Sequence, residues 1–171
     1  MKLITRLSVL VILILPLTGC HTSKKGSAGS GKSHPKVETV NVKNLKGEER
    51  KIVEEALTWQ GTPYKYGASN KGKGTDCSGM VVGVFSKVTD KKLPRNSREQ
   101  ADYCRPVKKK SIRPGDLVFF ATGKDPKRIS HVGIMIDDTR FIHASTKKGV
   151  IISELTTPYY ERTFIKCGRV P

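Results

Sequence analysis

The sequence predicts an α+β fold, in which N-terminal helices pack on an antiparallel sheet of five to six strands. Apolar residues recur at helical spacing in the first half of the chain, whereas short strand-like segments follow one another in the second half. A turn dipeptide, Pro114-Gly115, separates the two halves. Helices followed by a run of strands are typical of an α+β domain.

Three helices are expected in the first half. Apolar residues at helical spacing within residues 48–60 predict the first helix, and Gly61 ends it. A loop rich in glycine and lysine then continues to residue 75. Residues 77–88 are apolar on most faces, which predicts a buried second helix. Asn96 begins a capping pattern that opens a short third helix.

Five strands are expected in the second half. Short runs rich in valine, isoleucine and phenylalanine alternate there with turn residues, as in a sheet whose neighbouring strands are joined by tight turns. Such connections favour antiparallel pairing. The predicted strands are residues 116–120, 132–136, 141–144, 150–153 and 163–170.

Residues 1–19 have the pattern of a bacterial lipoprotein signal peptide. A short basic start is followed by an apolar segment, residues 7–17, which as a helix would rise only about 16 Å, half the thickness of a hydrocarbon core. The ending Leu17-Thr-Gly-Cys20 resembles a lipobox, where cleavage precedes the cysteine and the thiol receives a diacylglycerol. We therefore expect Cys20 to be the lipidated, palmitate-carrying N-terminus that anchors the protein in a membrane. The alternative is an ordinary signal peptide with an incidental cysteine.

Residues 20–47 are expected to form a disordered basic tether. They contain six lysines and one glutamate, many serines and glycines, and no aromatic residue, so they have little with which to build a core. A basic segment that lies on acidic lipid headgroups is an alternative with the same composition. Residues 48–171 are then the folded domain.

The strong positive charge extends beyond the tether. The chain has 32 Lys+Arg and 15 Asp+Glu, a net charge of +17. The export signal makes nucleic acid an implausible partner, so the expected polyanions are lipid headgroups, wall polymers and peptide carboxylates. The expected location is the bacterial cell envelope, at the outer membrane facing the periplasm if the bacterium is Gram-negative.

Cys77 is placed where a thiol can become a nucleophile. It opens the predicted buried helix, where unpaired backbone N–H groups and the helix dipole stabilise an anion. We therefore expect this thiol to ionise more easily than a free cysteine. The alternative is a small buried cysteine with no chemical role.

Two histidines supply a base and a group that orients it. His131 precedes one predicted strand, His143 lies within the next, and pairing about a turn centred on Asp137 places them nearly opposite. Side chains in that arrangement have Cβ atoms about 5 Å apart, so one imidazole can hold the other. With Cys77 they form the set that covalent catalysis requires. A zinc site is the competing use of these three residues, but the closely spaced ligand pairs typical of zinc are missing.

Six motifs in a fixed order resemble those of the NlpC cell-wall peptidases, which are papain-like cysteine peptidases of bacteria. The resemblance covers nearly all of residues 48–171 and implies the papain-like NlpC fold. The motifs are Gly61-Thr-Pro-Tyr-Lys-Tyr-Gly, Asp76-Cys-Ser-Gly, Leu93-Pro-Arg-Asn-Ser, Pro114-Gly-Asp-Leu-Val-Phe-Phe, His131-Val-Gly-Ile and Phe141-Ile-His-Ala.

The resemblance implies a role for each matching residue. Cys77 would be the nucleophile, His131 its general base and His143 the polar residue that orients the base. Tyr64 would donate its hydroxyl to the oxyanion, beside the backbone N–H of the nucleophile; one such donor is typically worth about 3 kcal/mol.

Two further positions and the cofactor requirement follow from the same resemblance. Asp76 and Ser78 would lie along the substrate cleft, near the free amino end of the peptide stem; capping of the helix is the alternative for both. The resemblance implies no metal and no organic cofactor.

The implied activity is that of a DL-endopeptidase on peptidoglycan stem peptides, cutting the bond from γ-D-glutamyl to diaminopimelate or lysine. Two alternatives stay open. One is an amidase or muropeptide-recycling peptidase of the same fold, and the other is a non-catalytic wall-binding lipoprotein. We expect a monomer.

Cys104 and Cys167 remain outside this site. An oxidising envelope would allow a disulfide between them, and the alternative is two unpaired buried thiols.

Overall fold

The computed structural model describes residues 40 and 42–171. The predicted signal peptide, Cys20 and the tether as far as residue 39 lie outside the described residues. The helical elements are η1 (Val42–Asn44), α1 (Gly47–Leu57), α2 (Cys77–Val88), α3 (Ser97–Tyr103), η2 (Lys109–Ser111) and α4 (Pro158–Thr163). The strands are β1 (Ser69–Asn70), β2 (Gly74–Thr75), β3 (Arg105–Val107), β4 (Leu117–Phe120), β5 (His131–Met135), β6 (Arg140–Ser145), β7 (Gly149–Glu154) and β8 (Phe164–Arg169).

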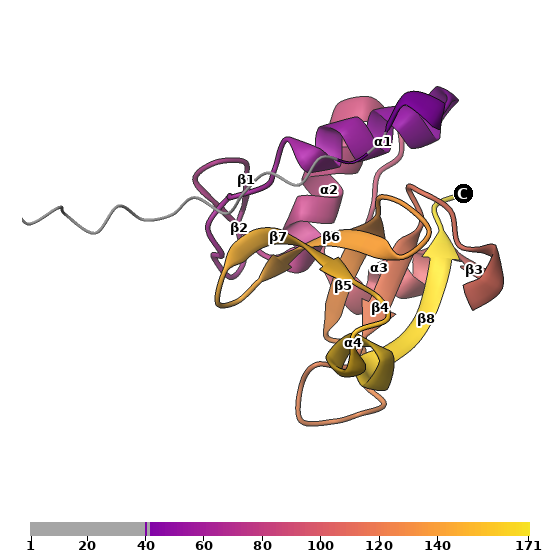
Figure 1. The fold of residues 1–171 in the computed structure, drawn as a ribbon. Helices are drawn as coiled ribbons and strands as arrows, with labels where there is room; N and C mark the ends of the chain where they lie inside the picture. The colour runs from indigo at the N-terminus through magenta and orange to yellow at the C-terminus, as the bar shows by residue number, and fades with distance from the viewer. Residues whose placement is uncertain (1–39, 41) are drawn as a thin grey trace, which may run out of the picture. The chain divides into compact units, whose positions relative to one another are not determined.

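The main sheet has six antiparallel strands in the order β3-β8-β4-β5-β6-β7. Helices α1 and α2 lie together on one side of it, and α4 lies at the opposite end, beside the start of β8 (Figure 1). The predicted α+β fold is confirmed, and the five predicted strands correspond to β4 through β8. The sixth strand, β3, is a three-residue edge strand that pairs only with β8.

Helix α2 is the buried helix that the sequence predicts. Met80, Val81 and Val84 are fully buried, and they join the larger core cluster between the helices and the sheet. Gly83 allows α1 and the turn after it to lie close to α2, because a Cβ atom at position 83 would come within 2.3 Å of the Trp59 ring. Close packing on this side fixes α2, and with it Cys77, against the sheet.

A second, smaller core cluster lies on the other face of the sheet. Alternate residues of β4 enter different clusters: Leu117 and Phe119 join the larger one, whereas Val118 and Phe120 join the smaller one. Tyr160 of α4 packs against the smaller cluster. The strand pattern is therefore continuously apolar because both faces of the sheet are covered.

The described residues before 48 also contact the folded domain. Val40, Val42 and Leu45 pack against the larger core, and α1 begins at Gly47. The end of the predicted tether therefore packs its apolar side chains against the domain. Within the described residues, no helix has the length and apolar character needed to cross a membrane.

Cys104 and Cys167 are buried free thiols in the structure. The Cys167 thiol donates a hydrogen bond to the Val107 carbonyl at 3.0 Å, and burial raises the pKa of Cys104 to about 12. The structure therefore has the unpaired alternative and not the disulfide.

Candidate active site

Cys77 is the first residue of α2, and it lines a cleft of about 620 Å³. Asp76 precedes it as the N-cap residue, and its Oδ1 atom accepts a hydrogen bond of 2.7 Å from the Gly79 N–H. Such a cap is favourable because the first N–H groups of a helix have no partner within the helix. The cap defines where α2 begins and so where the thiol lies.

The expectation that Cys77 ionises easily is wrong for the free protein. Burial raises the pKa of the thiol, and the neighbouring Asp76 carboxylate raises it further. The backbone N–H groups of Val132 and Ser78 lower it, but they do not offset the loss of water around the sulfur. The resting thiol is therefore protonated and needs a base to become a nucleophile.

Asp76 and Arg95 form the charged part of the site. The Arg95 guanidinium donates to both Asp76 oxygens, at 2.9 and 2.8 Å, and to the Ser78 hydroxyl at 3.0 Å. The Gly67 N–H donates to Asp76 Oδ2 at 2.7 Å, which ties the preceding loop to the helix. Burial acts to raise the pKa of Asp76, but hydrogen bonds from Arg95, Gly79 and Gly67 hold it below its ordinary value. The capping alternative is thus observed for Asp76, and both Asp76 and Ser78 also line the cleft.

His131 and His143 hydrogen-bond to each other. His131 Nε2 lies 2.8 Å from His143 Nδ1, and the two rings meet edge to face. His131 is the first residue of β5, and the backbone N–H of the next residue, Val132, lies beside the Cys77 thiol. The structure therefore places the two histidines in contact, and the residue after His131 beside the Cys77 thiol.

The register between β5 and β6 differs by two residues from the expected one. The Asp137 carboxylate accepts hydrogen bonds from the N–H groups of Thr139 and Arg140, at 2.9 and 2.7 Å, and the turn is centred one residue later than predicted. His131 and His143 are therefore diagonal neighbours and not directly opposite. Diagonal neighbours on one face remain within reach of aromatic side chains, so the contact survives the shift.

Both imidazoles are buried and neutral. Burial lowers the pKa of His131 to about 4, and burial together with the proximity of His131 lowers the pKa of His143 well below its usual value. The Phe120 ring packs near His131, and the Phe141 ring packs against His143. A neutral imidazole can accept the proton of a thiol, so the burial that keeps His131 neutral also keeps it available as a base.

Ser153 and Tyr160 complete the histidine cluster, and sequence reasoning did not find them. His143 Nε2 lies 2.9 Å from the Ser153 hydroxyl and 3.1 Å from the Tyr160 hydroxyl. Ser153 is on β7, where the alternation of side chains could have suggested its face. Tyr160 is on α4, which the sequence pattern did not predict.

Tyr64 and several basic residues line the cleft beside Cys77. Burial raises the pKa of Tyr64, and the neighbouring Cys77 raises it further, so its hydroxyl remains a hydrogen-bond donor at neutral pH. Four basic side chains face this cleft, against two acidic ones. They are Arg95, Arg98, Lys124 and Arg128, against Asp76 and Asp125.

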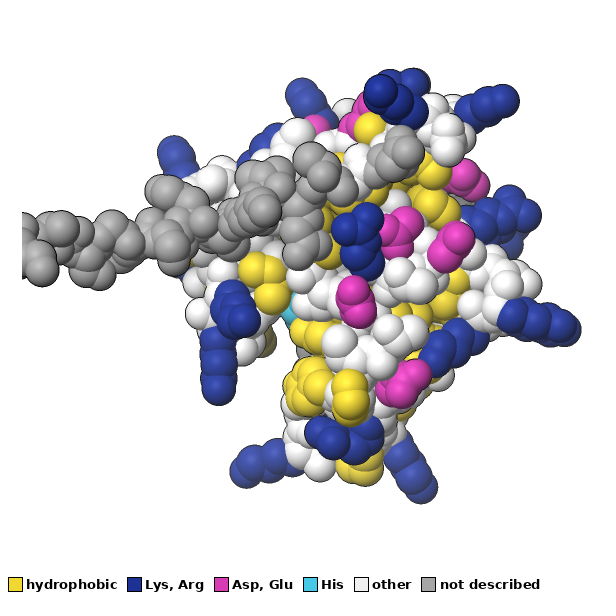
Figure 2. All heavy atoms as spheres, viewed as in Figure 1, with side chains coloured by type: hydrophobic (Ala, Val, Ile, Leu, Met, Phe, Trp, Pro, Cys, Tyr) yellow, Lys and Arg dark blue, Asp and Glu magenta, His cyan; other side chains and the backbone are white. Residues whose placement is uncertain are grey.

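A second cavity, of about 320 Å³, lies on the histidine side. His131, His143 and Tyr160 line it together with Lys147 from the β6–β7 turn. Figure 2 shows a histidine side chain at the edge of a recess, with lysines and arginines spread around the margin of the molecule. Among the residues that the structure describes, no group of three or more His, Cys, Asp or Glu could hold a metal ion.

Curated relatives match this domain in sequence over 113 to 133 residues. The chain is 42% identical over 113 residues to the "Probable endopeptidase NlpC" of Escherichia coli, which covers 66% of this chain and 72% of the relative. It is 39% identical over 129 residues to the murein DD-endopeptidase and LD-carboxypeptidase MepS of E. coli, and this match covers 75% of this chain and 66% of MepS. It is 36% identical over 133 residues to the muramidase and DL-endopeptidase CwlT of Bacillus subtilis, and this match covers 76% of this chain and 40% of CwlT.

A solved structure and a family comparison agree with these relatives. A lipoprotein-like protein of the NLP/P60 family from Staphylococcus aureus superposes with a TM-score of 0.64 at 31% identity. The match covers 72% of this chain and 41% of that one, so this chain spans about two fifths of its length. Residues 61–169 match the NlpC/P60 family, and they include every residue described in the site. The chain therefore belongs to the NlpC/P60 family, whose endopeptidases hydrolyse peptidoglycan, and it has the family's papain-like fold.

Proposed function

We propose that this protein is a cysteine peptidase of the bacterial cell wall, with Cys77 as nucleophile, His131 as general base and His143 as the group that orients the base. The observation that carries the proposal is the hydrogen-bonded pair His131–His143 next to the buried thiol at the start of α2. The Val132 backbone N–H beside the Cys77 sulfur links the thiol to β5, the strand that begins with His131.

The chemistry follows from the protonation states of the free site. When a stem peptide occupies the cleft, the Cys77 thiol gives its proton to neutral His131 and the sulfur attacks the amide carbon. The oxyanion that forms is stabilised by the backbone N–H of Cys77 and by the Tyr64 hydroxyl. His131 then protonates the leaving amine. Water, activated by the same imidazole, hydrolyses the thioester and releases the acyl part.

The substrate is a peptidoglycan stem peptide, cut between γ-D-glutamate and diaminopimelate or lysine. The basic lining of the cleft supports an anionic substrate, because Lys124 and Arg128 are exposed and oppositely charged to its carboxylates. CwlT is named a DL-endopeptidase, in keeping with this bond. MepS is named a DD-endopeptidase, so a cut within a crosslink is the second candidate.

The protein acts from a membrane anchor at Cys20 in this proposal. Its support is the order of a basic start, an apolar segment and the Leu17-Thr-Gly-Cys20 ending. Acyl chains on Cys20 would hold a monomer at the envelope, in the outer membrane of a Gram-negative cell. Mass spectrometry of the N-terminal peptide from a membrane fraction tests it: acylated Cys20 supports the anchor, and an unmodified peptide or an uncleaved leader contradicts it.

Product analysis tests the reaction. The full chain, purified in detergent, is incubated with peptidoglycan sacculi and with soluble muropeptides, and the fragments are identified by mass spectrometry. Cys77→Ala should release nothing, whereas Cys104→Ala, a buried cysteine outside the site, should release as much as the unaltered protein. New ends at γ-D-glutamate identify the DL bond, and new ends at D-alanine identify the DD bond. Absence of any Cys77-dependent release would overturn the enzymatic proposal and favour a wall-binding role.

A further inference from the structure

Three side chains continue the hydrogen-bond chain away from the cysteine. His143 uses Nδ1 toward His131 and Nε2 toward the hydroxyls of Ser153 and Tyr160, at 2.9 and 3.1 Å. Both nitrogens of His143 are therefore engaged, and the two hydroxyls are its only described partners on the outer side.

The direction in which protons are donated along these hydrogen bonds decides whether His131 can act as a base. A neutral imidazole carries one proton, on one of its two nitrogens. His131 can take the thiol proton only on a bare Nδ1, because Nε2 is engaged with His143. Its own proton must then sit on Nε2 and be donated to a bare His143 Nδ1. The proton of His143 is thereby placed on Nε2, which faces the hydroxyls of Ser153 and Tyr160.

We propose that Ser153 and Tyr160 are positioning residues that hold His143 in its Nε2–H tautomer and so keep Nδ1 of His131 free to act as the base. The inference rests on the proposed role of His131. Two hydroxyl oxygens facing one ring nitrogen favour this tautomer, because an N–H can be shared between two acceptors whereas a bare nitrogen has a single lone pair to offer. Both ring N–H groups then donate in the same direction, from His131 to His143 and from His143 to the two hydroxyls, and such an ordered chain strengthens each of its bonds.

The surroundings hold this arrangement in place. The rings of Phe120 and Phe141 pack against Tyr160, with ring centres 5.3 and 4.8 Å apart. Phe141 also stacks on His143, with ring centres 4.9 Å apart. These apolar neighbours offer no other partner for His143 Nε2. The tautomer therefore depends on the two hydroxyls.

Nitrogen NMR tests the tautomer directly. The full chain is labelled with ¹⁵N-histidine in detergent micelles, and long-range ¹H–¹⁵N correlations show which ring nitrogen carries the proton. We expect protonated Nε2 on both His131 and His143 in the unaltered protein. In the double variant Ser153→Ala/Tyr160→Phe, His143 should shift toward the Nδ1–H tautomer. Protonated Nδ1 on His143 in the unaltered protein would overturn the proposal, as would an unchanged Nε2–H signal in the double variant.

Kinetics on a soluble muropeptide give a second readout. Each hydroxyl contributes one hydrogen bond, so Ser153→Ala and Tyr160→Phe should each lower kcat roughly three- to tenfold, with KM unchanged. Ser153→Thr keeps the hydroxyl and should restore most of kcat, and Tyr103→Phe on α3 is the matched control. A double variant within twofold of the unaltered kcat, or a loss confined to KM, would contradict the proposal. If the unaltered protein cleaves no muropeptide, the proposed function fails, and the NMR result still decides the tautomer.

Discussion

The two sides of the candidate active site are built in different ways. On the helix side, Asp76 and Arg95 are an ion pair at the rim of the cleft, where the Arg95 side chain is 44% exposed. On the sheet side, His131 and His143 are buried and neutral, and their partners are hydroxyls. One side is held by charge and the other by neutral hydrogen bonds.

The difference shows how burial selects the groups a site can use. The Arg95 guanidinium keeps part of its water, and hydrogen bonds from Arg95, Gly79 and Gly67 offset the desolvation of the buried Asp76 carboxylate. A charge within the sheet would lose nearly all of its water, and burial accordingly lowers the pKa of His131 to about 4. Neutral imidazole is also the form that a general base requires. The site therefore places its fixed charges beside α2 and its proton-accepting group within the sheet.

The largest expected effect comes from removing the base on the sheet side. His131→Asn keeps a polar side chain but cannot accept the thiol proton, so kcat/KM on a muropeptide should fall by about 10³- to 10⁴-fold. Arg95→Gln, on the other side, should cost far less. Initial rates of product release, with circular dichroism to verify folding, provide the measurement. A loss below tenfold for His131→Asn would contradict the assignment of the base.

The next effect concerns the oxyanion. Tyr64→Phe removes one hydroxyl from the cleft and leaves both the ion pair and the histidines in place. We expect kcat to fall about 10²-fold with little change in KM, because an oxyanion donor acts in the transition state. Tyr66→Phe, an exposed tyrosine two residues away, is the control. Equal rates for Tyr64→Phe and Tyr66→Phe would remove Tyr64 from the mechanism.

Acid should destabilise the sheet side before the helix side. Below pH 6.5 an unfolded chain protonates His131, whereas the folded protein does so only near pH 4. Unfolding is therefore favoured progressively as the pH falls from 6.5 to 4, by about 3 kcal/mol for this residue. Asp76, whose pKa is lowered, stays ionised through this range. Thermal unfolding between pH 7 and pH 4.5 should show a smaller decrease for His131→Asn, and identical decreases would contradict the prediction.

Removing the Asp76 charge should lower the stability of the protein while raising the reactivity of the Cys77 thiol. Asp76→Asn weakens the cap and the bond to Arg95, so the free energy of unfolding should fall by about 1 to 2 kcal/mol. The same change removes a charge that raises the pKa of Cys77, so alkylation of the thiol at neutral pH should become faster. Urea unfolding and iodoacetamide kinetics measure the two effects, with exposed Asp102→Asn as control. Slower alkylation would show that Asp76 does not raise the pKa of Cys77.

Helices and strands were predicted best where their apolar pattern can be identified within a short stretch of sequence. Residues 77–88 could be assigned to a buried helix, and β4 through β8 could be placed as strands, because their apolar patterns are long and unambiguous. Helix α4 was missed because its six residues are mostly polar and its place depends on packing against the sheet. Strand β3 contains Pro106 and forms only as an edge partner of β8.

The same distinction applies to the site. Cys77, His131 and His143 could be found because cysteine and histidine are scarce and their spacing is informative. The direction of the pKa shift of Cys77 could not be predicted, because the helix start is a local feature whereas burial comes from packing against β5. Ser153 and Tyr160 are ordinary residues in sequence, and only the fold brings them to His143.

The smallest expected effect is one of salt on the charged cleft. Lys124 and Arg128 are exposed and line the cleft, so their attraction to an anionic peptide should be screened as the screening length falls from about 10 Å at 0.1 M salt to about 3 Å at 1 M. We expect KM to rise a few-fold over this range, with kcat unchanged, because exposed charges assist binding more than chemistry.

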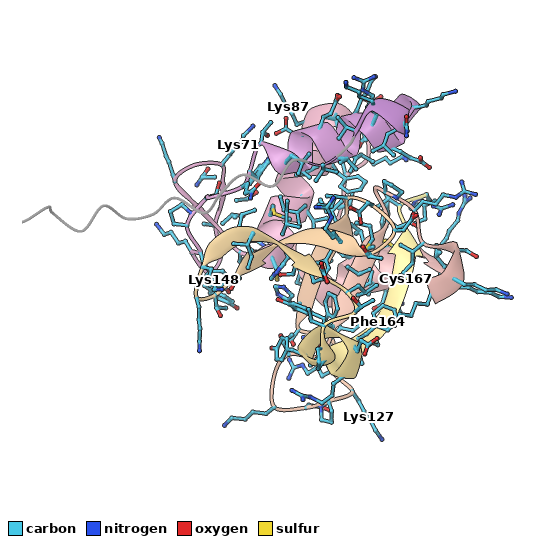
Figure 3. All side chains as sticks on the ribbon, viewed as in Figure 1. Lys71, Lys87, Lys127, Lys148, Phe164 and Cys167 are labelled. Atoms are coloured by element: carbon cyan, nitrogen blue, oxygen red, sulfur yellow. The ribbon has the colours of Figure 1, made fainter. Side chains whose placement is uncertain are left out.

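A pair of matched variants assigns this salt effect to the cleft. Lys124→Gln should raise KM at low salt and reduce its dependence on salt. Lys127→Gln removes the same charge from the same loop, but Lys127 does not line the cleft and projects from the loop before β5 (Figure 3), so its KM should follow that of the unaltered protein. Equal effects of the two substitutions would mean that overall charge, and not the lining of the cleft, attracts the substrate. The histidine side should be insensitive to both, because its groups are neutral and buried.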